Sequence, residues 1–397
     1  RMRNLVAEDE FPYKTASGIL WDRSSFTECL TRACEEVGYE ALRAEQAAAR
    51  AAGRWFGIGL ASYAELTGIG SRIAVAPGMP INTGTETGTV RIDSTGAVTA
   101  SFGVASQGQG HETSLAQIVA EELGVRIEDI EILQGDSALA AHGTGTYASR
   151  GAVLAGGAAI LAARAVRDKV VRAASHILEA APDDVATANG DVFVVGTDRR
   201  MSIRELAKAV YSEMGSLPKD LRDDMGNLEA TKVYDPFTGT ATSATHIAVV
   251  EIDPETYEVM VRRYVVVEDC GRVINPMIAD GQAHGGVAQG IGAALFEEMI
   301  HDSDGQVLTA NLADYVVPTA LEIPPINVVH LQAELPGTVG GFRGLGEGGT
   351  IGAPAAIANA VSDALSKFGI EINELPATPQ RLFHLIKRAR AQGLDID

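Results

Sequence analysis

One carboxylate stands in a stretch of residues that have almost no side chains. Residues 344–349 read G-L-G-E-G-G, with Glu347 as the acid. A carboxylate without bulky neighbours can approach a reacting atom closely, and partial dehydration would raise its pKa toward that of a useful general base. The loop therefore predicts a general base at Glu347. A solvated glutamate in a flexible turn would show the same pattern.

The same loop formally satisfies the G-x-G-x-x-G pattern of dinucleotide-binding proteins through Gly344, Gly346 and Gly349. That motif must follow a strand, and it needs an acidic residue about 20 positions later, at the end of a second strand. The residues before this loop make a poor strand, and the nearest acid, Asp363, falls inside a predicted helix. A nicotinamide-dinucleotide enzyme is therefore a weak alternative, excluded if no core strand leads into the loop.

Two further polar, glycine-containing loops precede predicted helices. Residues 107–111 (Q-G-Q-G-H) place glutamine amides and backbone N–H groups at a helix N-terminus, which suits a phosphate or a heteroaromatic edge. Residues 144–150 (T-G-T-Y-A-S-R) combine hydroxyls, backbone amides and an arginine, which suits an oxyanion or a phosphate. Helix-capping turns would explain each loop equally well in isolation.

The elements around these loops mix strands and helices without regular alternation. The pattern of apolar residues predicts a helix capped by Ser24 or Ser25, and a loose acidic stretch at 218–224. Such a mixture favours an α+β architecture over a doubly wound sheet. The other expected helices are 41–52, 112–123, 153–174, 203–211, 279–298 and 355–368, and the expected strands and hairpins are 55–63, 87–104, 127–133, 188–195, 245–252 and 258–267.

Composition excludes several classes of function. The 397 residues carry a net charge of −20, which disfavours nucleic acids and anionic membranes as partners. The longest apolar stretch, 152–163, is too short to span a bilayer, and no signal peptide precedes the first motif. The three cysteines form no CxxC motif, so neither a disulfide framework nor a zinc site is expected. We expect a cytoplasmic protein.

Five motifs occur in a fixed order along the chain and together resemble the molybdopterin-binding large subunit of the xanthine oxidase family. Among the branches of that family, the aerobic carbon monoxide dehydrogenase type is the most similar in character. The resemblance covers nearly the whole chain and corresponds to the C-terminal half of the large subunit. The motifs are G-Q-G-H at 108–111, G-T-Y-A-S-R at 145–150, D-C-G-R-V-I-N-P at 269–276, G-Q-A-H-G-G-V-A-Q-G at 281–290 and G-L-G-E at 344–347.

The resemblance implies a fold of aldehyde-oxidoreductase-type molybdenum-cofactor-binding domains, α+β with mixed sheets and packed helices. Residues 1–53 would be the tail of a preceding molybdenum-binding domain. Residues 54–397 would form the C-terminal domain in two lobes, one of 54–180 plus 330–397 and the other of 181–329. The family's N-terminal glycine loop, its first molybdenum-site glutamine and its substrate-selecting loop have no counterpart here. We therefore expect activity only together with the N-terminal half of the large subunit. Either the large subunit is naturally split into two polypeptides, or its N-terminal half has been removed.

The resemblance also implies residue roles. Glu347 corresponds to the active-site base, which takes a proton from a water-derived hydroxide at the metal, and Gln109 and Gln289 correspond to glutamines that bond the pterin and its ligands. The metal itself is held by the pterin dithiolene and by no protein side chain. A buried packing role would explain Cys270 equally well. The implied cofactor-binding residues are Gly108, Gln109, Gly110, Thr146, Tyr147, Ser149, Arg150, Cys270, Asn275, Gln282, Gln289, Gly344, Leu345 and Gly346.

The implied cofactor is molybdenum–molybdopterin, in bacterial members usually the cytosine dinucleotide. The implied reaction oxidises a small substrate of the aldehyde, N-heterocycle or carbon monoxide type, with water as the oxygen source. Electrons would pass to a 2Fe–2S small subunit and an FAD medium subunit, in a dimer of such heteromers. A non-catalytic structural or assembly partner with the same fold is the alternative, and Glu347, Gln109 and Gln289 argue against it.

Overall fold

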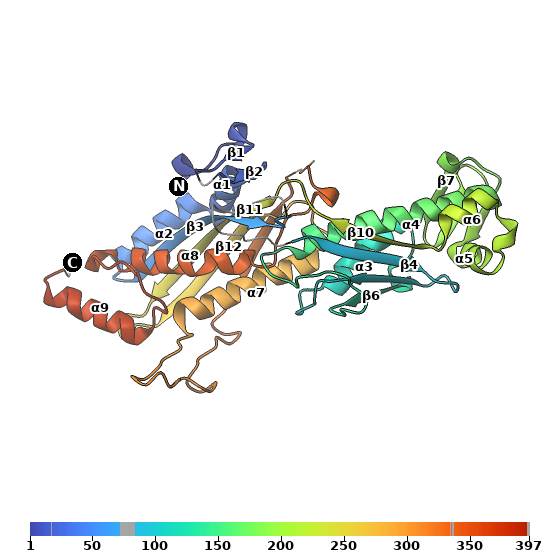
Figure 1. The fold of residues 1–397 in the computed structure, drawn as a ribbon. Coiled ribbons are helices and arrows are strands. Elements are labelled where there is room, and N and C mark those ends of the chain that lie inside the picture. Colours follow the sequence, from blue (N-terminus) through green and yellow to red (C-terminus); the bar gives the residue numbers. More distant parts are fainter. Residues whose placement is uncertain (17, 72–83, 334, 336, 395–397) are drawn as a thin grey trace.

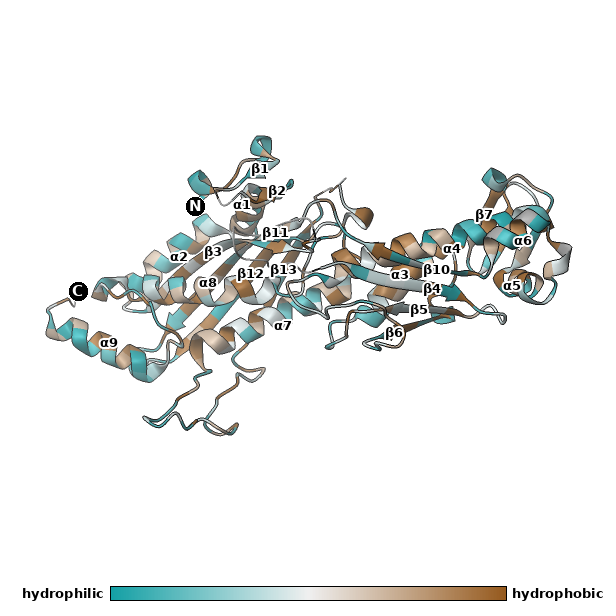
Figure 2. Ribbon diagram, in the orientation of Figure 1, coloured by the Kyte–Doolittle hydropathy of each residue, from teal (hydrophilic) through white to brown (hydrophobic). Residues whose placement is uncertain are grey.

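The computed structural model describes residues 1–16, 18–71, 84–333, 335 and 337–394. Two four-stranded sheets, each covered by its own helices, form two lobes that lie end to end (Figure 1). Hydrophobic residues gather along the strands of both sheets, whereas the outward-facing helices α2 and α9 carry many hydrophilic residues (Figure 2). Within the described residues, no helix is long and apolar enough to cross a membrane.

The first lobe is built on the sheet β13-β12-β11-β3. Strands β3 (Trp55–Thr67), β11 (Thr240–Ile252) and β12 (Val259–Asp269) are antiparallel, and β13 (Ile326–Leu331) joins β12 in parallel. One face packs against α1 (Phe26–Val37) and α2 (Tyr39–Ala51). The other face packs against α7 (Pro276–Leu295) and α8 (Gly348–Ala364), with α9 (Pro379–Ala391) beyond them. Because both faces are covered, almost every residue of β11 is buried.

Small residues allow α8 to lie unusually close to the sheet. A Cβ atom on Gly57 or Gly59 of β3 would come within 1.9 Å of the carbonyl oxygens of Ala360 and Ala356, respectively. Since real Cβ atoms do not approach so closely, only glycine fits at these two positions. The glycines of β3 and the alanines of α8 therefore fix the position of the helix that begins directly after Glu347.

The second lobe is built on the sheet β10-β4-β5-β6. Its strands are β4 (Glu86–Ile92), β5 (Val98–Phe102), β6 (Ile130–Gln134) and β10 (Glu229–Tyr234). Helices α3 (His111–Leu123) and α4 (Gly156–Ile177) close its core, and a π-helical turn, Gly151–Ala155, leads into α4. The far end of this lobe carries β7 (Val185–Ala188), β8 (Asp191–Val194), β9 (Arg200–Ser202), α5 (Ile203–Ser212) and α6 (Lys219–Met225). In the first lobe, β1 (Tyr13–Lys14) and β2 (Leu20–Trp21) form a small ribbon beside α1.

The α+β class predicted from the sequence is confirmed, and most predicted elements lie within a few residues of their expected positions. Two local predictions are wrong, and two elements were missed. The stretch 218–224 is helical (α6), because it packs Leu221 and Met225 into the second core. Helix α8 starts at Gly348, ahead of the expected 355, since Pro354 lies within a helix that is already formed. Strand β13 and helix α9 were not predicted.

The structure groups the segments differently from the two predicted lobes. Strand β3 pairs with β11 along its whole length, so residues 55–67 share a sheet with residues 240–269, and residues 86–234 form the second lobe. Helices α1 and α2 pack on the same first sheet, although they lie in the segment expected to belong to a preceding domain. Pairing between strands far apart in sequence, which local periodicity does not reveal, decides this division.

Candidate functional site

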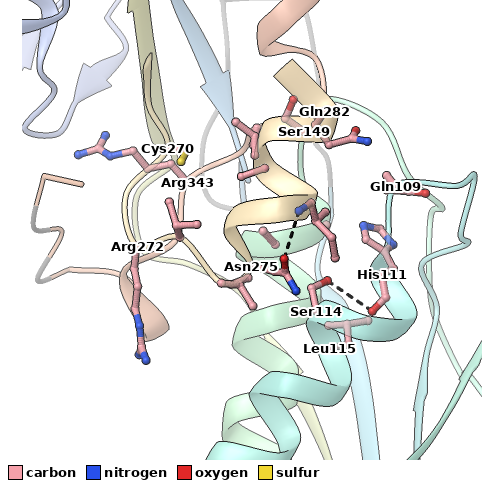
Figure 3. Close-up of a pocket in the computed structure, with 18 of the residues that line it drawn as sticks. Gln109, His111, Ser114, Leu115, Ser149, Cys270, Arg272, Asn275, Gln282 and Arg343 are labelled. Atoms are coloured by element: carbon pink, nitrogen blue, oxygen red, sulfur yellow. Dashed lines mark hydrogen bonds between the residues drawn. The ribbon is translucent and has the colours of Figure 1, made fainter. Parts of the chain in front are cut away.

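A cavity of about 120 Å³ lies at the junction of the two lobes. Figure 3 shows its walls: Gln109, His111 and Ser114 come from the start of α3, Asn275 and Gln282 from α7, and Cys270 and Arg343 from the segments that face them. All five motifs, spread between residues 108 and 347 of the sequence, therefore contribute residues to this cavity. The predicted cofactor-binding residues that line this cavity are Gln109, Thr146, Ser149, Cys270, Asn275, Gln282, Leu345 and Gly346.

A second, more open cavity of about 500 Å³ adjoins the first. The two share Gln282 and Gly346, and the second adds Gln289 and Glu347. The predicted base and two of the predicted glutamines thus line one space. A site that spanned both cavities would reach from the start of α3 to Glu347.

The Glu347 loop is held by the loop that precedes α4. The backbone N–H of Ala148 donates to Glu347 Oε1 at 2.9 Å, and the backbone N–H of Glu347 donates to Ser149 Oγ at 3.1 Å. Ala148 and Ser149 adopt φ values of 50° and 47°, a left-handed conformation that is uncommon for residues other than glycine. Two motifs 200 residues apart therefore orient one carboxylate, whose side chain is exposed on the wall of the second cavity.

A second carboxyl, to which the sequence assigned no role, lies beside the first. Glu65 on β3 is 9% exposed, and burial raises its pKa to about 8. The hydroxyl of Ser149 acts in the opposite direction, whereas the negative charges of Glu347 and Glu268 raise the pKa further. Glu65, which neighbours Glu347, is therefore the carboxyl that has the environment of a buried acid.

The predicted glutamines differ in whether their side-chain amides already make hydrogen bonds within the protein. Gln109 uses its amide within its own loop, accepting from the N–H of Gln107 at 2.5 Å. Within the described part of the chain, the side-chain amides of Gln282 and Gln289 make no hydrogen bond. Those two amides remain available to a ligand in the shared cavity.

The structure gives Arg150 and Tyr147 places outside both cavities. The Arg150 guanidinium is fully buried and donates to Glu86 at 2.9 Å, to the carbonyl of Gly145 at 2.7 Å and to that of Thr85 at 3.0 Å. Burial raises the pKa of Glu86, although Arg150 acts against it. Tyr147 is 40% exposed, with Arg150 at the face of its ring. The phosphate-binding role predicted for Arg150 is thus unsupported by its contacts, which bind the loop 144–150 to β4.

Cys270 and Asn275 have structural partners as well as a place on the cavity wall. Cys270 is buried, which raises the pKa of its thiol and keeps it neutral, and its carbonyl accepts from the N–H of Arg343 at 2.9 Å. Asn275 caps α7 by accepting from the N–H of Ile278 at 3.1 Å, and it donates to Gln117 of α3 at 3.0 Å. The Asn275 side chain therefore connects the two lobes beside the cavity.

The predicted glycines serve mainly to let segments meet. A Cβ on Gly110 would lie 2.7 Å from Ile278 of α7, and one on Gly344 would lie 2.4 Å from the carbonyl oxygen of Ser149. A Cβ on Gly346, by contrast, would meet only Gln282 Oε1, at 3.9 Å. Gly108 has a φ of 97° and no neighbour near its Cβ position, so there the turn itself requires glycine.

Sequence reasoning missed two residues of the wall. His111 is 9% exposed, burial lowers its pKa, and its Nδ1 has no hydrogen-bond partner among the described residues. Its position directly after the G-Q-G turn was the available signal. Arg343 is almost fully buried, with its guanidinium 3.2 Å from Ser24 Oγ and 3.4 Å from Asp22. No cluster of three or more His, Cys, Asp or Glu side chains suited to a metal ion is found in the ranges that the structure describes.

No core strand leads into the loop at 344–349. Within the described residues, the segment before it consists of the short 3₁₀ turn Val339–Gly341, and the preceding strand, β13, ends at Leu331 on the edge of its sheet. Asp363 bonds to Gln46 and to the backbone of Ile58, inside the first lobe. The nicotinamide-dinucleotide alternative is therefore excluded.

Comparison with known proteins gives a consistent result. Residues 32–324 match the model of the molybdopterin cofactor-binding domain family. Over 98% of its length the chain is 40% identical to the nicotine 6-hydroxylase large subunit of Paenarthrobacter nicotinovorans and, again over 98%, 35% identical to the carbon monoxide dehydrogenase large chain of Hydrogenophaga pseudoflava. These alignments cover 47% and 48% of the two relatives, so the chain spans about half the length of the curated relatives it matches.

Solved structures agree. The crystal structure of quinoline 2-oxidoreductase from Pseudomonas putida 86 superposes with a TM-score of 0.90 at 42% identity, covering 98% of this chain and 49% of that one. Aldehyde oxidoreductase from Desulfovibrio desulfuricans shares the fold at a TM-score of 0.68 and 19% identity, covering 94% of this chain and 36% of the other. The aldehyde-oxidoreductase-type fold predicted from the sequence is thereby confirmed.

Proposed function

The chain belongs to the molybdopterin cofactor-binding domain family, and from that premise we propose that it is the C-terminal half of the large subunit of a molybdenum hydroxylase. One observation carries this proposal. Glu347 is held at its backbone N–H and at Oε1 by the loop 144–150, and it faces a cavity that it shares with Gln282 and Gln289. Glu347 would serve as the general base of the reaction.

The donors around the two cavities fit a pterin dinucleotide. Helix α3 begins after Gly110, which has no side chain to cap the N–H groups of the first turn, so those groups can bind an anionic phosphate. The amides of Gln282 and Gln289 offer both donors and acceptors to a heterocycle. The first cavity is smaller than the 300–1,000 Å³ or so of a usual ligand pocket, which suits a site completed by another segment.

When bound, the cofactor supplies the redox chemistry and the metal, with water as the source of oxygen. This chain supplies position and a proton acceptor. Glu347 Oε1 is occupied by the N–H of Ala148, which leaves Oε2 as the atom that accepts the proton. The bond to Ala148 keeps the carboxylate in one orientation, and the glycines on both sides leave its approach open.

The finer assignments follow the relatives. We infer that the cofactor is the cytosine dinucleotide form, that electrons pass to 2Fe–2S and FAD subunits, and that the assembly is cytoplasmic. The remaining half of the large subunit completes the pocket. The similarity to nicotine 6-hydroxylase and quinoline 2-oxidoreductase favours an N-heterocycle over an aldehyde or carbon monoxide as substrate.

The test is Glu347→Gln in the complex purified with its natural partners. Gln keeps the size and the acceptor for Ala148 but removes the base, so we expect turnover to fall by about 10²–10⁴-fold while the molybdenum content is unchanged. Steady-state kinetics and elemental analysis measure the two quantities. Near-normal turnover in this variant would refute the assignment of the base. Absence of molybdenum from the wild-type complex would instead support a non-catalytic assembly partner.

A further inference from the structure

A row of titratable side chains crosses the sheet of the first lobe. Tyr63 on β3 pairs with Ala244 on β11, Ala244 pairs with Glu268 on β12, and Glu268 pairs with His330 on β13. Directly paired residues point to the same face of a sheet. Ala244 has the smallest side chain of the four, so it leaves room for Tyr63 and Glu268 to approach each other above it.

One end of this row reaches Glu347. Glu65 follows Tyr63 by two positions on β3 and therefore points to the same face. The polar neighbours of its carboxyl are Ser149, Glu347 and Glu268. Glu65 thus lies between the proposed base and the rest of the row.

The other end reaches the surface. His330 Nδ1 lies 3.1 Å from Glu268 Oε1, and His330 Nε2 lies 2.9 Å from Asp280 Oδ1 on α7. The side chain of Glu268 is fully buried, that of His330 is 12% exposed and that of Asp280 is 52% exposed. Exposure therefore increases step by step from the core of the sheet to solvent.

The middle of the row lies beneath the first turn of α8. A Cβ on Gly348 would be 2.8 Å from Tyr63 Oη and 3.0 Å from Glu268 Oε2, so these two oxygens are at most 5.8 Å apart. Tyr63 Oη, both oxygens of Glu65, both oxygens of Glu268 and Nδ1 of His330 are buried with no hydrogen-bond partner among the described residues, so the 3.1 Å approach of Glu268 to His330 is an ion-pair distance without hydrogen-bond geometry. Buried polar atoms of a purely structural cluster would be paired with one another, so this arrangement calls for another explanation.

The protonation states suit a path for protons. Burial raises the pKa of Glu268, although His330 acts against it and Asp280 and Asp269 add to it. The pKa of Tyr63 is raised by burial and by Glu268 and Glu65, with smaller contributions in the same direction from Cys29 and Cys270. Burial alone would lower the pKa of His330, but Glu268 and Asp280 raise it overall. The upward pKa shifts of Tyr63, Glu268 and His330 therefore favour the protonated form of each of these side chains.

We propose that Glu65, Tyr63, Glu268 and His330 relay protons from Glu347 to the surface at Asp280, an inference that rests on the proposed role of Glu347. The proton on Glu347 passes to Glu65 as the acid proton of Glu65 moves on. The hydroxyl of Tyr63 accepts one proton while it donates another to Glu268. Glu268 in turn passes a proton to Nδ1 of His330, and His330 releases a proton from Nε2 to Asp280 or solvent. No electrons move, and ordered water bridges any gap longer than a hydrogen bond.

The first test uses His330→Ala in the assembled holoenzyme, with His284→Ala as the matched control. His284 is exposed on the same surface, and among the residues that the structure describes its side chain bonds only to the carbonyl of Asp280, at 2.7 Å. We expect His330→Ala to lower kcat by at least about tenfold, to shift its pH profile and to be rescued by added imidazole. The control variant should show none of these effects.

The second test uses Tyr63→Phe, with Tyr264→Phe as the matched control. Tyr264 is also buried on this sheet, and its hydroxyl bonds at 2.9 Å to His246, which touches Tyr63 only through a ring contact with centroids 5.8 Å apart. Only Tyr63→Phe should lower kcat and enlarge the solvent deuterium isotope effect. Independently of activity, infrared spectra of the cofactor-free complex at pH 7 should show a protonated buried carboxyl that disappears in Glu65→Gln.

The outcomes separate the two proposals. If Glu347→Gln abolishes turnover but His330→Ala and Tyr63→Phe behave like their controls, the relay is wrong and the base assignment stands. If Glu347→Gln retains turnover, the proposed function fails as well. Should Tyr63→Phe not fold, the imidazole rescue and the infrared band still decide the question: absence of both overturns the relay.

Discussion

Arg150 and Glu86 form an ion pair whose two side chains are both fully closed to solvent. The resemblance suggested that Arg150 contacts the phosphates of the cofactor, but the guanidinium is occupied by Glu86 and two carbonyls. We interpret it as a positioning residue that holds the loop 144–150, and through that loop Glu347. The partner that decides this role lies 64 residues earlier, so the local motif could not reveal it.

Arg150→Met should therefore cost about 3–5 kcal/mol of stability, because it leaves the Glu86 carboxylate buried without a counter-charge. The double variant Arg150→Met with Glu86→Gln should recover most of that loss, since Gln keeps an acceptor for the N–H of Gly103, which bonds to Glu86 at 2.9 Å. Thermal unfolding of the complex and its molybdenum content measure both effects. If the double variant is stable but free of molybdenum, Arg150 contacts the cofactor after all.

Glu65 shows more clearly than Arg150 which residues of the site could not be predicted from the sequence. The sequence singled out Glu347 from its glycine neighbours, and the structure places Glu347 in a cavity with Gln282 and Gln289. The sequence, by contrast, gave no reason to single out Glu268, which lies in an apolar strand, or to pair Glu268 with Glu65. Their proximity arises from strand register and from the position of α8, neither of which a single local pattern encodes.

At the scale of elements, the contact between α8 and β3 positions the base, because α8 begins directly after Glu347. Gly59→Ala would place a Cβ 1.9 Å from the carbonyl oxygen of Ala356, so the helix must shift. We expect a loss of about 1–3 kcal/mol of stability together with lower kcat. The matched control is Gly281→Ala on α7, where a Cβ meets nothing within 4 Å and helix propensity should give about 0.5–1 kcal/mol of extra stability.

Thermal unfolding and steady-state kinetics of both glycine variants provide the check. A Gly59→Ala variant as stable and active as the wild type would show that α8 does not need this close approach. The periodic apolar positions of α3 and α4 made those helices predictable from sequence. The start of α8 could not be predicted in this way. Its glycines and its proline have low helix propensity, and tertiary packing stabilises the helix despite them.

At the scale of the whole molecule, the cavity depends on contacts between the two lobes. Asn275 bonds to Gln117, Arg272 pairs with Glu121 at 2.9 Å, and Gly110 lets α3 approach Ile278. Local periodicity predicted the elements of each lobe, whereas the lobe bounds implied by the resemblance differ from the two observed sheets, because the chain leaves the first sheet after β3 and returns to it only at β11. A ligand bound at this junction would touch segments from both lobes at once.

Cofactor loading should therefore protect both lobes from amide hydrogen exchange at the junction and nowhere else. Ligand binding stabilises the segments it contacts against local opening, so exchange should slow in residues 107–115, 144–152, 270–282 and 343–349. The sheet β7–β9 and α5, at the far end of the second lobe, provide an internal control. Comparison of the holo and cofactor-free complexes by mass spectrometry gives the measurement, and protection confined to one lobe would contradict a cofactor site that spans both cavities.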